Sequence, residues 1–129
     1  MGTATGNPTA LQPVVLVVDD EPLQRRSLMR LMRPLDVREA SGAFSAIELL
    51  VNGLEPDLVL CDVSMGDGTG VDLKNWLSDQ RPELLERLVF MTGLGADGAT
   101  AVQPYRTLMK PLTLLEIEDV VRLAHCHLE

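Results

Sequence analysis

The chain has 129 residues, 46% of them hydrophobic, which suits a single domain with one core. Its formal net charge of -8 argues against a surface that binds nucleic acid directly, because such surfaces normally carry a basic excess. The acidic balance fits solubility, attraction of cations, or basic protein partners.

Residues 1–13 contain neither Lys nor Arg and no apolar stretch. They match no signal peptide, and we expect a disordered lead-in or an interdomain linker. The apolar run that follows, Val14 to Val18, is too short to cross a bilayer, so we expect no membrane insertion. Two cysteines, Cys61 and Cys126, are too few for a disulfide framework, which favours a reducing, cytoplasmic location.

Five short segments predict β-strands. Three of them are apolar throughout and too short for helices, which is typical of strands buried on both faces of a parallel sheet. These three are Val14–Val18, Leu58–Cys61 and Leu88–Met91. Val37–Ala40 is half polar and is expected at an edge of the sheet, and Thr107–Met109 is expected to form a short last strand.

Helical patterns fill the intervals between these strands. Apolar spacing predicts helices over Leu23–Arg33, with Leu28, Leu31 and Met32 on one face; over Ala43–Asn52, with Phe44, Ile47, Leu50 and Val51 on one face; and over Val71–Gln80. A last helix begins with a capping box, Thr113 and Glu116, and runs to about Cys126. In the interval 93–106, three glycines and Pro104 predict a fourth helix that is short or irregular. The alternation predicts an α/β fold with a parallel sheet covered on both faces.

Polar residues follow four of the five predicted strands. Asp19 and Asp20 follow the first, Asp62 the third, Thr92 the fourth and Lys110 the fifth. In an open parallel sheet, ligands bind at the carboxyl ends of strands, where strand order reverses. With the first strand central, we expect these five side chains to meet in one crevice.

These residue types suit the transfer of a phosphoryl group. Clustered carboxylates repel one another until a hard cation such as Mg²⁺ binds them, and Mg²⁺ also binds phosphate oxygens. One carboxylate can instead act as a nucleophile and form an aspartyl phosphate. A Lys ammonium can neutralise charge on the phosphoryl group, and a Thr hydroxyl can donate a hydrogen bond to it. Each residue alone is an ordinary turn residue, and only the combination indicates a site.

Together these segments resemble the receiver domain of two-component response regulators. The likeness covers Val14 to about Cys126 and rests on four stretches: VVLVVDDEP at 14–22, LVLCDVSMGDGTGVDL at 58–73, LVFMTG at 88–93 and LMKPL at 108–112. It implies a receiver domain over residues 14–127 with a flavodoxin-like, doubly wound five-stranded parallel sheet of order 2-1-3-4-5. It also implies phosphorylation by a histidine kinase or a histidine phosphotransfer domain, signalling by conformational change, and catalysis of no reaction beyond its own phosphorylation and dephosphorylation.

The resemblance implies a role for each residue of the crevice. Asp62 is the expected phospho-acceptor. Asp20 and Asp62, with the backbone carbonyl of Ser64, are the expected ligands of Mg²⁺ or Mn²⁺, and Asp19 is expected to act through a metal-bound water. The hydroxyl of Thr92 and the ammonium of Lys110 are expected to hold the phosphoryl group.

One departure from the family concerns the switch. Its usual aromatic residue, three positions before Lys110, is replaced here by Thr107, so Tyr105 is the other candidate switch residue. We expect Gly93–Arg106 itself to change order on phosphorylation, because glycine-rich segments lie at the low-stability end of a domain. The shortened segment before Lys110 also resembles receivers at the ends of hybrid histidine kinases.

Three other functions are weighed against this one. A dehalogenase-type phosphatase needs an acid two residues after its nucleophile, where Ser64 follows Asp62. A flavin or nucleotide binder needs a glycine-rich loop where Asp19 and Asp20 stand. A pseudo-receiver would lack phosphorylation residues that are present here. A homodimer is compatible with the sequence.

Four arginines lie on the first predicted helix of this otherwise acidic chain: Arg25, Arg26, Arg30 and Arg33. They fit either a solvated polar face or the docking of a histidine-bearing partner, for which the family uses this helix.

Overall fold

The computed structural model describes residues 13–33, 35–63, 70–93, 106–110 and 112–126. The elements follow in the order β2 (Val14–Val18), α1 (Pro22–Leu31), β3 (Asp36–Ala40), α2 (Ala43–Val51), β4 (Leu58–Asp62), α3 (Gly70–Gln80), the 3₁₀ helix η2 (Pro82–Arg87), β5 (Leu88–Thr92), β6 (Thr107–Met109) and α5 (Leu114–Cys126). No helix within these ranges is long and apolar enough to cross a membrane.

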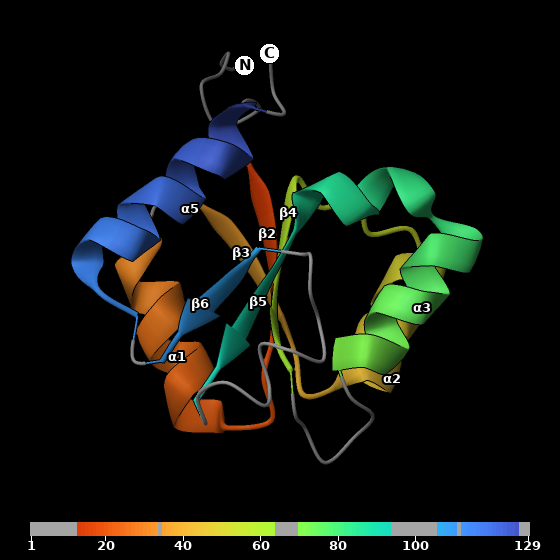
Figure 1. Ribbon diagram of the computed structural model, residues 1–129, viewed down its shortest axis with the longest axis horizontal. Helices are drawn as coiled ribbons and strands as arrows, with labels where there is room; N and C mark the ends of the chain where they lie inside the picture. The colour runs from red at the N-terminus through yellow and green to blue at the C-terminus, as the bar shows by residue number, and fades with distance from the viewer. Residues whose placement is uncertain (1–12, 34, 64–69, 94–105, 111, 127–129) are drawn as a thin grey trace, which may run out of the picture.

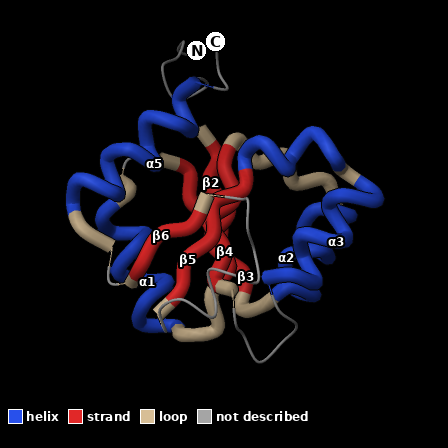
Figure 2. Tube along the Cα trace, viewed as in Figure 1, coloured by secondary structure: helices blue, strands red, loops and turns tan. Residues whose placement is uncertain are grey.

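The strands of this part of the chain form a five-stranded parallel sheet of order β3-β2-β4-β5-β6. Numbered along the chain, that order is 2-1-3-4-5, so the predicted fold is confirmed. Helices α1 and α5 cover one face of the sheet, and α2 and α3 cover the other (Figures 1 and 2). The strand order reverses between β2 and β4, so the carboxyl ends of these two strands lie side by side.

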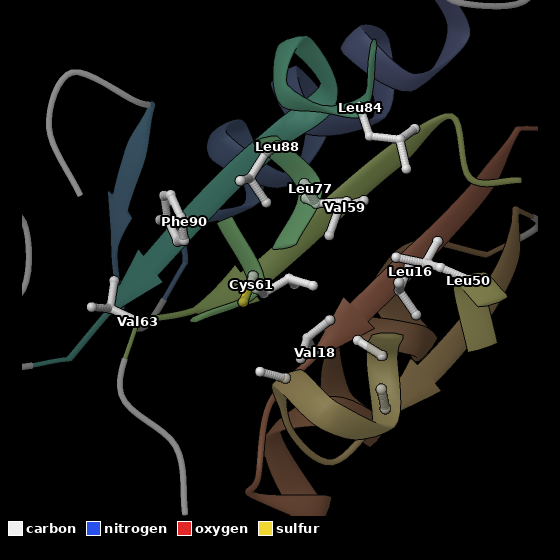
Figure 3. Packing of buried hydrophobic residues seen from close by; sticks show 14 residues of the cluster. Leu16, Val18, Leu50, Val59, Cys61, Val63, Leu77, Leu84, Leu88 and Phe90 are labelled. Carbon is white, nitrogen blue, oxygen red and sulfur yellow. The ribbon is translucent and has the colours of Figure 1, made fainter. Parts of the chain in front are cut away.

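The core has two halves because successive side chains of a strand point to opposite faces. In β2, Leu16 and Val18 pack toward α2 and α3, and Val15 and Val17 pack toward α1 and α5. Figure 3 shows the first of these halves, which includes Cys61 as the small buried residue that the sequence predicts. Burial of both faces explains why the central strands are apolar throughout.

Three residues predicted to face the core are instead exposed: Leu31 by 51%, Phe44 by 58% and Val51 by 68%. In α2 the buried residues are Ala43, Ala46 and Leu50. Small alanines let the helix lie close to the sheet, and Phe44, about 100° further round the helix, then points to the side. The predicted faces were therefore correct at Leu28, Met32 and Leu50, which are buried, and wrong at the three exposed residues.

Two helix ends follow the predicted chemistry. At the start of α5, the Thr113 N–H donates to Glu116 Oε1 (2.8 Å) and the Glu116 N–H donates to Thr113 Oγ1 (3.1 Å), which confirms the capping box. Beyond α2, Gly53 adopts a φ of 109°, a conformation that favours glycine.

Other predictions have mixed outcomes. The η2 helix was not predicted; it buries Leu84 between α3 and β5. The expected fourth helix within 93–106 and the expected lead-in of residues 1–13 lie almost wholly outside the described residues.

Candidate functional site

Three carboxylates converge where the strand order reverses. Asp19 and Asp20 follow β2 and Asp62 ends β4, and each offers an oxygen within 4.8 Å of the others. Asp19 is fully buried, Asp62 is 7% exposed, and Asp20 lies at the surface. The predicted convergence of these three residues is therefore present in the structure.

Lys110 reaches this cluster from β6. Its Nζ donates hydrogen bonds of 2.9 Å to Asp19 Oδ2 and to Asp62 Oδ2, and one of 2.6 Å to Gln24 Oε1. Its backbone N–H donates to the Thr92 carbonyl (2.8 Å), which fixes the start of the side chain beside β5. Burial lowers the pKa of Lys110, but hydrogen bonds and charge from Asp62 and Asp19 outweigh it, so the net pKa is raised.

Asp19 is held on all sides. Its Oδ1 accepts the Glu21 N–H (2.9 Å), its backbone N–H donates to the Ala40 carbonyl (3.1 Å), and its own carbonyl accepts Arg25 Nη1 (2.6 Å). Arg25 Nε also pairs with Glu39 on β3 at 2.8 Å. A buried carboxylate is costly unless its oxygens are paired, and here both are.

The other predicted site residues fall into two groups. Thr92 is buried at the end of β5, beside the carboxyl end of β4. Thr107 is half-buried on β6, opposite Phe90. Ser64 and Tyr105 lie outside the described residues.

Two residues near the site escaped the sequence analysis. Gln24, on the first turn of α1, accepts a hydrogen bond from Lys110, and no motif in the sequence points to it. Gly70, at the start of α3, lies so close to the Asp62 backbone that an added Cβ would be 2.7 Å from the Asp62 carbonyl oxygen. The available signal was a glycine directly before a predicted helix, the last of three at alternate positions (Gly66, Gly68 and Gly70), since glycine permits close backbone approach.

The sequence and the fold are both similar to those of known proteins. The family model of the response regulator receiver domain matches residues 15–122. The chain belongs to this family. As a receiver domain it is a signalling domain, and the predicted resemblance is confirmed.

Individual relatives agree with the family. The chain is 33% identical to the photosynthetic apparatus regulatory protein RegA of Rhodovulum sulfidophilum over 70% of this chain and 48% of RegA. It is 35% identical to the response regulator protein PilR of Pseudomonas aeruginosa over 84% of this chain and 25% of PilR. The receiver domain thus spans half or less of these relatives. A putative response regulator from Chloroflexus aurantiacus has the same fold, with a TM-score of 0.77 at 21% identity, covering 89% of this chain and 98% of that one.

The cluster of this receiver domain could hold a metal ion. Three carboxylates meet here, and Lys110 contacts two of them, Asp19 and Asp62. All three offer oxygen atoms, which hard divalent cations prefer.

The contact at Gly70 gives the first prediction. Gly70→Ala should lower the free energy of unfolding by about 1–3 kcal/mol, because the new methyl group overlaps the Asp62 carbonyl, the Val63 backbone and the Phe90 ring. Urea denaturation measures this loss. Gly93→Ala, directly after β5, is the matched control, because an added Cβ there meets, within the described part of the chain, only Lys110 Cδ, at 3.9 Å. Equal stability of the two variants would contradict the prediction.

Proposed function

We propose that this receiver domain accepts a phosphoryl group on Asp62 in a two-component phosphorelay, with Mg²⁺ or Mn²⁺ bound beside it. One observation carries the proposal: Asp62 lies within a carboxylate cluster and also accepts a hydrogen bond from a buried ammonium. The first feature suits a metal ion, and the second suits a group that gathers negative charge. A histidine kinase or a histidine phosphotransfer domain is the proposed donor, and the cytoplasm is the proposed location of this domain.

The proposed step is a displacement at phosphorus. A carboxylate oxygen of Asp62 forms a bond to the phosphorus atom, the bond from phosphorus to the donor's imidazole nitrogen breaks, and that nitrogen keeps the electron pair. Lys110 supplies positive charge beside the oxygens of the group in transit, and the Thr92 hydroxyl would donate to the bound product. A divalent cation held by Asp20, Asp62 and the Ser64 carbonyl, with Asp19 acting through water, would neutralise further charge.

The proposed output is a change of shape. Thr107 is too small to replace a ring in an aromatic switch, so the proposal is that the segment Gly93–Arg106 changes order on phosphorylation, with Tyr105 as the alternative switch. A receiver of a hybrid histidine kinase and a homodimer both remain compatible with this proposal.

Phosphorylation of Asp62 is directly measurable. Incubation with acetyl phosphate and Mg²⁺ should add one phosphoryl group, detected by intact mass, and Asp62→Asn should abolish the addition. Asp79→Asn, an exposed carboxylate on α3, is the control and should be labelled normally. Labelling of the Asp62 variant would place the acceptor elsewhere, and an unlabelled wild type would favour a pseudo-receiver.

Divalent cation should also stabilise the fold, because it relieves repulsion among Asp19, Asp20 and Asp62. At ten times its Kd a ligand adds about 1.4 kcal/mol of stability, which raises Tm by a few degrees for a domain of this size. Thermal melts with and without millimolar Mg²⁺ measure the rise. Asp20→Ala should remove most of it and Asp79→Ala should not. An unchanged Tm in the wild type would refute the metal site.

The arginines of α1 separate into two sets. Arg25 donates to the Asp19 carbonyl and forms an ion pair with Glu39, so its role is structural. Arg26, Arg30 and Arg33 are exposed and pair with no carboxylate of the described residues; they line a groove of about 410 Å³ between α1 and β3. Like charges four residues apart on a helix repel one another, so these side chains cost stability on their own. We propose that they dock an acidic surface of the phosphodonor.

Charge reversal tests the docking. Arg26→Glu with Arg30→Glu should slow transfer from the cognate donor about tenfold or more, by loss of electrostatic steering, and should leave acetyl phosphate labelling intact. The control is Arg106→Glu with Arg122→Glu, which makes the same change in net charge at two exposed positions away from the groove; Arg106 directly precedes β6, at the opposite edge of the sheet from β3. Equal slowing by both pairs would indicate a general effect of charge instead of docking.

A further inference from the structure

Lys110 has three N–H donors, and all three have acceptors. Two acceptors are the carboxylates of Asp19 and Asp62, and the third is the side-chain amide oxygen of Gln24 at 2.6 Å. We propose that Gln24 is a positioning residue that holds the Lys110 ammonium in place during phosphoryl transfer to Asp62. This inference rests on the proposed function and adds a residue to it.

The chemistry of the three acceptors supports this role. When Asp62 is phosphorylated, its carboxylate becomes an acyl phosphate, and the oxygen bonded to phosphorus loses its charge and becomes a weak acceptor. Asp19 and Gln24 do not react, so two anchors persist and the third N–H can turn to a phosphoryl oxygen. Because the Gln24 amide is neutral, it fixes the position of the ammonium without cancelling the charge that the phosphoryl group needs.

The surroundings of Gln24 offer few substitutes. A pocket of about 540 Å³ beside Lys110 is lined mainly by apolar residues: Leu23, Leu28, Leu31, Met91 and Leu112. Ser27 is the other polar side chain among the described lining residues besides Gln24 and Lys110. The side chain of Lys110 is 15% exposed and Gln24 lies at the surface, so water can take the place of the lost acceptor but does not hold a fixed position as a side chain does.

The helix that carries Gln24 is itself held in place. Its neighbour Arg25 donates to the Asp19 carbonyl (2.6 Å) and pairs with Glu39 on β3 (2.8 Å). The start of α1 is thus attached both to Asp19, which follows β2, and to the edge strand β3. Because the backbone of this turn is held in place, Gln24 can restrain the Lys110 ammonium instead of moving with it.

The experiment compares two variants with one control. Gln24→Met keeps the length of the side chain and removes the acceptor; Gln24→Glu keeps an acceptor and adds a charge. The control, Ser27→Ala, removes a hydroxyl from the next turn of α1, beside the same pocket. The readouts are the maximal rate constant and the half-saturating concentration for phosphorylation by acetyl phosphate, solvent exchange of the Lys110 ammonium protons by NMR, and Tm.

Gln24→Met should lower the maximal rate constant about three- to tenfold, the range expected for the net loss of one typical hydrogen bond that water can partly replace, with the half-saturating concentration little changed. Its ammonium protons should exchange faster, while Tm stays within about 2 °C of the wild-type value, since surface changes seldom alter stability much. Gln24→Glu should restore slow ammonium exchange and raise the half-saturating concentration, because the added carboxylate repels an anionic donor. Ser27→Ala should behave as the wild type.

The outcomes separate the two proposals. A labelled wild type with an equally fast Gln24→Met variant overturns the role of Gln24 alone, as does equal slowing in Ser27→Ala. A wild type that takes no phosphoryl group overturns the proposed function and this inference together. A slow Gln24→Met variant whose Tm falls by many degrees, and which Gln24→Glu does not rescue, overturns the positioning role in favour of a structural one.

Discussion

Two buried carboxylates sharing one ammonium are the interaction around which this end of the molecule is built. Asp19 and Asp62 both accept hydrogen bonds from Lys110 Nζ at 2.9 Å, and Asp19 is completely buried. An unpaired buried carboxylate would cost several kcal/mol, so the positions of β2, β4 and β6 must agree closely for these pairs to form. Asp20 adds a third carboxylate to the same cluster.

The sheet order supplies that agreement. Parallel strands place their carboxyl ends at one edge, and α1, which follows β2, and α3, which follows β4, lie on opposite faces of the sheet, so the chain leaves Asp19 and Asp62 in opposite directions. The two halves of the core hold the strands from both faces. Gly70 then lets α3 begin directly against the Asp62 carbonyl. The apolar core and the charged crevice therefore depend on the same strand register.

The structural features that were predicted correctly from the sequence are mainly those set by the residues of one short segment. The strands were located to within one residue because runs such as Leu58–Cys61 can only be buried, and the capping box at Thr113 was found because its chemistry is local. The exposed Phe44 was placed wrongly because helix phase depends on how closely Ala43 and Ala46 approach the sheet. Gln24 was missed because its contact with Lys110 joins residues 86 positions apart in the sequence and leaves no local pattern. The converging carboxylates were predictable only because the topology could be inferred first.

The state of Lys110 indicates how such a site can be controlled. Its pKa is raised above the ordinary value of 10.5, so the stability that its charge contributes is fully present below that value and is lost only as the pH rises through the higher folded-state value. Across the neutral range the ammonium therefore stays charged. Under the proposed function, new charge would change the balance: a divalent cation among the carboxylates, or a phosphoryl group that competes for the donors of Lys110. A lysine that remains charged and has more than one acceptor within reach is suited to that exchange of partners.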